Sequence, residues 1–100
     1  MKKKIINTII NSIMEINQSL DNKIIVKDNS DAHLYGKKGQ LDSLGLINLL
    51  VATEQNIEDD FDVSITIADE RAMSQKHSPF RTVGTLADYI EILLKEKEND

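Results

Sequence analysis

The sequence predicts an all-α domain. Three observations lead to this expectation: apolar residues recur at helical spacing in long segments, capping-type residues precede those segments, and aromatic residues are scarce. The chain has 100 residues, of which 40% are hydrophobic and 4% aromatic, with no Trp and one Pro. This aliphatic composition favours helices over a β-sandwich, and the length suits a single domain that spans residues 1–100.

The first predicted helix covers roughly residues 4–19. Its apolar residues recur three and four positions apart and should face the core; they are Ile6, Ile9, Ile10, Ile13, Ile16 (or Met14) and Leu20. Three lysines oppose the helix dipole at the N-terminal end. We therefore expect residues 1–4 to fray.

A long polar loop follows the first helix. Residues 27–40 contain turn-forming residues and two glycines, and we expect Leu34 and Tyr35 to anchor them to the core. Asp28 and Asp31 lack the ligand spacing and central glycine of a calcium loop. No metal site is predicted.

The second predicted helix runs from Ser43 to Phe61. Asp42 and Ser43 suit a helix start, because their side-chain oxygens can accept the unpaired first N–H groups. A modifiable oxygen there lies at the positive end of the helix dipole, which favours a phosphate.

The second helix should have two different faces. The face predicted to be buried carries Leu46, Leu49, Leu50, Thr53, Ile57 and Phe61. The opposite face combines three apolar residues, Leu44, Ile47 and Val51, with acids. An exposed apolar stripe beside a modifiable residue is a better candidate for a docking surface than for ordinary helix surface.

A short third helix is predicted from Ile67 to Gln75. Thr66 and Asp69 have the spacing of a capping box, with Asp in place of the usual Glu. The helix should stop before Pro79, because the residue before proline avoids helical geometry.

The last predicted helix begins after Thr82 or Thr85. Thr85 forms the better capping box, since Asp88 follows three residues later. Phe80 should lie in the core, and residues 96–100 should be disordered. The apolar face of this helix consists of Val83, Leu86, Ala87, Ile90, Leu93 and Leu94.

Charge is distributed unevenly along the chain. The net charge is -5. Residues 1–38 carry seven Lys and four acids, residues 39–70 carry eight acids and no Lys or Arg, and residues 71–100 carry five of each sign. The acidic middle third does not favour nucleic acid, because phosphates would be repelled. It favours partners with basic surfaces, whose encounter rate it would raise.

The chain has no Cys, which excludes a disulfide framework and a thiolate nucleophile and fits a reducing cytoplasm. No apolar stretch approaches the ~20 residues that span a bilayer. Polar residues interrupt the N-terminal apolar run, so no signal peptide is predicted. A cytoplasmic location is expected.

Several segments together resemble one family. The run Leu41-Asp42-Ser43-Leu44-Gly45-Leu46, the long acidic helix ending near Phe61, the short helix after Ile67 and the segment from Thr82 to Ile90 look like an acyl carrier protein. The resemblance covers most of the chain. It implies a four-helix bundle with a long loop between helices one and two and a short third helix.

The resemblance also implies a function. Ser43, next to Asp42, would carry 4′-phosphopantetheine, attached by a separate phosphopantetheinyl transferase that uses coenzyme A and magnesium. The protein would be a monomer and a carrier of acyl thioesters, not an enzyme. Longer loops than usual point to a stand-alone carrier of a dedicated lipid, polyketide-like or surface-polysaccharide pathway.

Two further sets of residues receive roles from this interpretation. Partner enzymes with basic patches would dock on Leu44, Ile47, Val51, Glu54, Glu58 and Asp59. The acyl chain would be sheltered in a cavity lined by Leu46, Leu50, Ile67, Leu86 and Ile90.

Three alternatives remain open. A peptidyl or D-alanyl carrier would use the same serine and the same arm. An unmodified helical interaction module would use Asp42 and Ser43 merely as caps and Leu44, Ile47 and Val51 as a dimer seam. An enzyme is the least favoured, because no catalytic motif connects Ser43 with the two histidines, and no metal-ligand spacing is present.

Overall fold

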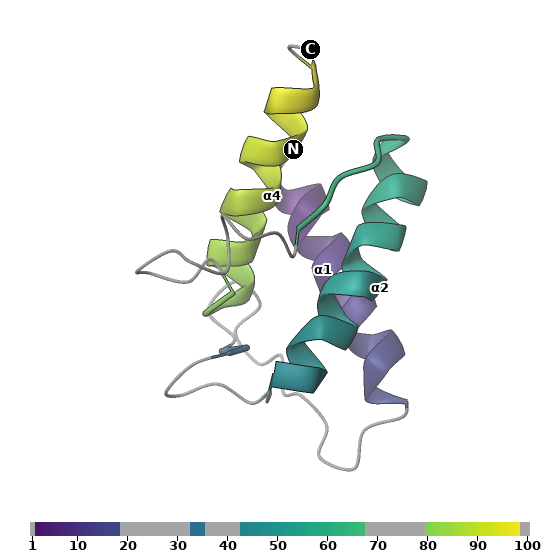
Figure 1. The fold of residues 1–100 in the computed structure, drawn as a ribbon, viewed down its shortest axis with the longest axis vertical. Coiled ribbons are helices and arrows are strands. Elements are labelled where there is room, and N and C mark those ends of the chain that lie inside the picture. Colours follow the sequence, from purple (N-terminus) through teal and green to yellow (C-terminus); the bar gives the residue numbers. More distant parts are fainter. Residues whose placement is uncertain (1, 19–32, 36–42, 68–79, 99–100) are drawn as a thin grey trace.

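The computed structural model describes residues 2–18, 33–35, 43–67 and 80–98 (Figure 1). These residues form three helices: α1 (Lys2–Asn17), α2 (Ser43–Phe61) and α4 (Val83–Glu98). They contain no strand apart from an isolated antiparallel bridge between His33 and Thr82. The all-α prediction is confirmed for the described part of the chain.

The predicted short third helix is not confirmed. Its span from Ile67 to Gln75 lies outside the described residues except for Ile67, which is not helical. The described fold is therefore three helices, and the four-helix bundle stays a prediction. Among these helices none is long and apolar enough to cross a membrane.

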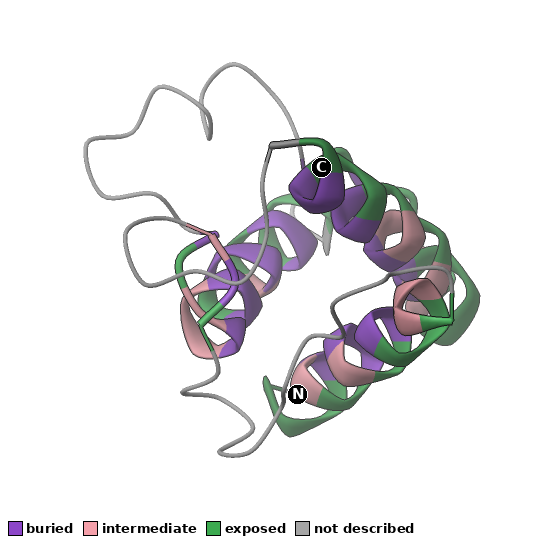
Figure 2. Ribbon diagram, turned by 90° about the horizontal axis from the view of Figure 1, so that it is seen from below, coloured by how far each residue is buried: buried purple, intermediate pink, exposed green. Residues whose placement is uncertain are grey.

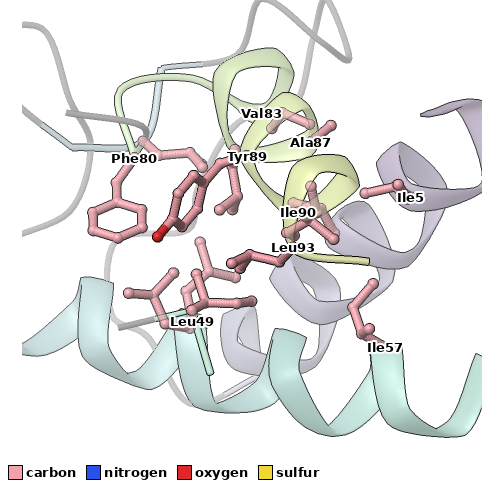
Figure 3. Packing of buried hydrophobic residues seen from close by; sticks show 14 of the residues in the cluster. Ile5, Leu49, Ile57, Phe80, Val83, Ala87, Tyr89, Ile90 and Leu93 are labelled. Atoms are coloured by element: carbon pink, nitrogen blue, oxygen red, sulfur yellow. The ribbon is translucent and has the colours of Figure 1, made fainter. Parts of the chain in front are cut away.

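Helix α1 is the central element, because it is in contact with both α2 and α4 (Figure 1). Buried residues of the helices face inward and exposed ones face outward (Figure 2). The core is one cluster to which all three helices contribute, together with residues of the segments between them. Figure 3 shows Phe80, Tyr89 and Leu93 filling the space above α2.

The buried face of α1 differs from the predicted one. It consists of Ile5, Thr8, Ile9, Ser12 and Ile13. Ile6, Ile10 and Ile16 are only partly buried, and Met14 is exposed. The predicted stripe was thus displaced around the helix and omitted Ile5; Leu20 lies outside the described residues. The reason is that two hydroxyl residues occupy the buried face.

Both hydroxyls have hydrogen-bond acceptors. Ser12 Oγ donates to the carbonyl of Thr8 at 2.9 Å. The single hydroxyl proton of Thr8 is shared between the carbonyl of Lys4, at 3.0 Å, and Asp60 Oδ2 on α2, at 2.7 Å. A buried hydroxyl that makes a hydrogen bond avoids most of the desolvation penalty. Because Thr8 and Ser12 are polar, a buried face predicted from apolar spacing does not include them.

Two lysines at the start of α1, Lys2 and Lys4, contact neighbouring helices. Lys2 Nζ lies 2.7 Å from Asp88 Oδ1, and the hydrogen bond that Lys2 donates to Asp88 raises the pKa of Lys2. Lys4 Nζ donates to the carbonyl of Asp60 at 3.1 Å and lies 4.7 Å from the ring centroid of Phe61. Positive charge is favourable at the C-terminal end of α2. Helix α1 accordingly begins at Lys2, within the segment predicted to fray.

Helix α4 begins one turn earlier than the preferred capping box predicted. The N–H of Thr85 donates to Thr82 Oγ1 at 3.1 Å, and the N–H of Thr82 donates to Thr85 Oγ1 at 3.0 Å. Thr82 is therefore the N-cap, and the preference for Thr85 with Asp88 was wrong. The helix continues to Glu98, so residues 96–98 are helical where disorder was predicted.

Leu34, a predicted loop anchor, and Phe80, predicted to lie in the core, are fully buried. Tyr35, the other predicted anchor, is partly buried and packs against the core. The N–H of Leu34 donates to the carbonyl of Arg81 at 2.8 Å, and the N–H of Tyr35 donates to the carbonyl of Phe80 at 3.2 Å. These bonds attach residues 33–35 to the segment that leads into α4.

A residue with left-handed backbone geometry directly follows helix α2. Asp62 has a φ of 55°, and its N–H donates to the carbonyl of Glu58 at 2.9 Å. This geometry closes a helix and reverses the chain. The chain then turns back along α2 (Figure 1), where Ile65 and Ile67 join the buried cluster.

Candidate functional site

The N-terminal end of α2 is the candidate modification site. Ser43 is the first residue of α2, as predicted. The first N–H groups of a helix have no partner within it, and the helix dipole gives this end partial positive charge. Asp42 and the side chain of Ser43 lie outside the described residues. The backbone thus places residue 43 where an attached phosphate would be stabilised.

The buried face of α2 is the one that the sequence predicts. Leu46, Leu49, Leu50, Thr53 and Ile57 are buried, and Phe61 is half-buried at the end of the helix. The hydroxyl of Thr53 donates to the carbonyl of Leu49 at 2.8 Å, which allows a polar residue in this row.

The opposite face of α2 is exposed and partly apolar. Leu44, Ile47 and Val51 have 68%, 48% and 51% of their surface exposed. Their spacing of three and four residues aligns them on one side of the helix, starting next to Ser43. Aligned exposed aliphatic residues of this size are a candidate interface.

The acids of α2 fall into three different environments. Glu58 and Asp59 are exposed. Glu54 is only partly exposed, and its Oε1 accepts a hydrogen bond from the N–H of Ile67 at 2.7 Å. Asp60 Oδ2 accepts one from Thr8 Oγ1 at 2.7 Å. The three acids predicted to dock partners, Glu54, Glu58 and Asp59, are thus not equivalent.

A polar seam joins α1 to α2; we use this name for Thr8, Ser12, Asn56 and Asp60. Besides the bond from Thr8 to Asp60, Asn56 Nδ2 donates to Ser12 Oγ at 2.8 Å and to Glu15 Oε2 at 3.3 Å. Sequence reasoning missed this seam. Its signal was present, because Thr8 and Ser12 are four residues apart on one helix and Asn56 and Asp60 are four apart on the other.

The five residues assigned to an acyl cavity lie in the same cluster. They are at most 1% exposed and come from α2, from the segment after it and from α4: Leu46, Leu50, Ile67, Leu86 and Ile90. Ile90 points from α4 toward the space above α2 (Figure 3). The sequence therefore placed all five correctly in the interior.

Within the described residues no group of three or more His, Asp or Glu could hold a metal ion. His33 is exposed, and His77 lies outside the described part, as do Asp28 and Asp31.

Comparisons of the chain with protein-family models, curated proteins and solved structures found no match.

Proposed function

We propose that this protein is an acyl carrier protein whose prosthetic group, 4′-phosphopantetheine, is attached to Ser43. The group would supply a thiol that carries an acyl chain as a thioester. The proposal rests on the resemblance of the sequence and on one structural observation. That observation is that α2 starts at Ser43 and carries an exposed apolar stripe on one side and a buried aliphatic face on the other.

The N-terminal end of α2 is suited to hold the phosphate of 4′-phosphopantetheine. The backbone N–H groups of the first turn and the positive end of the helix dipole favour the phosphate. Leu44, the next residue, is largely exposed, so a modifying enzyme has surface to contact beside residue 43. Asp42 would lie at the same helix end. The role of this chain is to hold the attachment point on a rigid helix.

The exposed side of α2 would bind partner enzymes. Leu44, Ile47 and Val51 would provide apolar contact, and Glu58 and Asp59 would attract basic patches. We leave Glu54 out of this docking surface, because its carboxylate already binds the N–H of Ile67. The partners would be a phosphopantetheinyl transferase and acyl-transferring or acyl-ligating enzymes, with the carrier acting as a cytoplasmic monomer.

The aliphatic interior would shelter the cargo. Each methylene group moved from water into an apolar interior contributes about 0.8 kcal/mol. Leu46, Leu50, Ile67, Leu86 and Ile90 would surround the chain, and they are aliphatic side chains that can adjust to it. The cargo must also leave, so a core with few aromatic residues suits this task.

The deciding experiment is intact-mass measurement after incubation with coenzyme A, magnesium and a promiscuous phosphopantetheinyl transferase. The serine hydroxyl would form an ester with the phosphate next to pantetheine, its proton would pass to the transferase, and adenosine 3′,5′-bisphosphate would leave. We expect a mass gain of one phosphopantetheine in the wild type and in Ser64→Ala, whose serine is exposed after α2. Ser43→Ala should gain nothing. Absence of any gain in the wild type would refute the proposal.

A second candidate is favoured by the exposed stripe itself. Leu44, Ile47 and Val51 could form the seam of an unmodified helical interaction module. Dimerisation that survives Ser43→Ala, together with no mass gain, would support that function. A peptidyl or D-alanyl carrier would show the mass gain and would be separated by charging with aminoacyl instead of acyl donors.

A further inference from the structure

The carboxylate of Glu54 connects two parts of the chain that flank the core. Its Oε1 accepts a hydrogen bond from the N–H of Ile67 at 2.7 Å, across 13 residues of sequence. Ile67 is fully buried, whereas the neighbouring Thr66 is exposed. The bond therefore fixes the point at which the segment after α2, residues 62–67, inserts into the core.

This segment closes a side of the core that no helix pair closes. The described helix pairs in contact are α1 with α2 and α1 with α4. In Figure 1 the segment 62–67 turns back from the end of α2 and crosses toward α4. Ile65 and Ile67 bring it into the shared cluster. It thus forms a short, non-helical wall on one side of the interior.

On the side of α2 that faces α1, side-chain hydrogen bonds close the interior. There the polar seam joins α1 to α2 through side-chain hydrogen bonds from Thr8 to Asp60 and from Asn56 to Ser12. An apolar chain entering between these helices would break both of these side-chain bonds, which is unfavourable. The wall made by residues 62–67 is not helical, so it could move without unwinding a helix; opening it would break the bond from Ile67 to Glu54 and expose Ile65 and Ile67.

We propose that Glu54 is a latch: its carboxylate holds residues 62–67 over the core and thereby controls how well an apolar cargo is covered. Glu54 is a positioning residue, since it acts through Ile67. The part of this inference that concerns a cargo rests on the proposed carrier function. The part in which Glu54 holds residues 62–67 rests on the geometry alone. Leu46 and Leu50 precede Glu54 on the same helix, so a chain passing from Ser43 along them would reach Ile67 beside the latch.

Hydrogen exchange tests the latch without any cargo. A hydrogen bond to a charged acceptor contributes enough that its loss should speed exchange of the Ile67 amide by about tenfold to a hundredfold in Glu54→Ala. Glu54→Gln retains an acceptor and should show a smaller change. Glu58→Gln removes the same charge from an exposed position of the same helix and should leave exchange at Ile67 unchanged. Equal rates in Glu54→Ala and Glu58→Gln would overturn the latch.

Release of a carried octanoyl group by hydroxylamine tests the consequence. We expect release to be several-fold faster from Glu54→Ala than from the wild type, with partial restoration in Glu54→Gln. Thr8→Ala is the control for general loss of stability, because Thr8 belongs to the polar seam and not to the wall. Its release rate should stay near that of the wild type.

The outcomes separate the two proposals. Faster release from Glu54→Ala alone supports the latch as a control of cargo. Equal release from Glu54→Ala and wild type, or equal acceleration by Thr8→Ala at a matched loss of stability, overturns it. If no phosphopantetheine can be attached to Ser43, the carrier function and the cargo role fail together, while the exchange experiment still decides whether Glu54 holds the wall.

Discussion

Thr8 on α1 donates a hydrogen bond of 2.7 Å to the carboxylate of Asp60 on α2. Thr8 is buried, whereas Asp60 is exposed, so the bond ties the edge of the core to the surface of the neighbouring helix. With the bond from Asn56 to Ser12, one turn later on α1 and one turn earlier on α2, it sets the register of α1 against α2. Hydrogen bonds to charged groups are among the stronger ones in proteins.

The first prediction concerns this bond. A double-mutant cycle of Thr8→Val and Asp60→Ala should give a coupling energy of about 1 kcal/mol or more in the free energy of unfolding. Urea denaturation measures it. The matched cycle with Asp59→Ala, an exposed neighbour on the same helix, should show no coupling. Equal coupling in both cycles would mean that the bond does not stabilise the α1–α2 contact.

The second prediction concerns the start of α4. Thr82→Ala removes the N-cap hydroxyl and should lower the free energy of unfolding by about 1 kcal/mol. Thr85→Ala should have an effect that is not additive with it, because the two residues bond reciprocally. Thr66→Ala, at an exposed position, is the control. Additive losses from Thr82→Ala and Thr85→Ala would argue against a capping box.

The third prediction concerns the end of α2. Asp62 has a left-handed φ of 55°, which glycine adopts without steric strain. Asp62→Gly should therefore be more stable than Asp62→Ala by about 1 kcal/mol in thermal or urea unfolding. At Ser64, which does not have a positive φ, alanine should be at least as stable as glycine. The same order at both positions would speak against a specific left-handed cap.

The fourth prediction concerns the docking surface of the proposed carrier. Glu58→Lys and Asp59→Lys should each lower the association rate with a phosphopantetheinyl transferase severalfold at low salt and reduce its salt dependence. Stopped-flow measurement at two ionic strengths provides the test. Glu96→Lys makes the same charge change at an exposed site on α4 and should have a smaller effect. If all three variants behave alike, net charge and not this surface sets the rate.

Much of the architecture could be predicted from local sequence. Helix α2 begins and ends where its capping residues and apolar spacing indicated, and its buried and exposed faces follow the helical repeat. The burial of Leu34, Phe80 and Ile67 was equally predictable, because large apolar residues within polar segments are favoured in a core.

Sequence by itself determined the helical class, the start of α2 at Ser43 and the division of α2 into two faces. Only the tertiary structure decided which polar residues are buried and which acids are engaged. Thr8 and Asp60 are 52 residues apart in sequence, and Glu54 and Ile67 are 13 apart. The physical reason is that a helical repeat fixes the direction of each side chain, whereas its partner depends on which other element packs against that face.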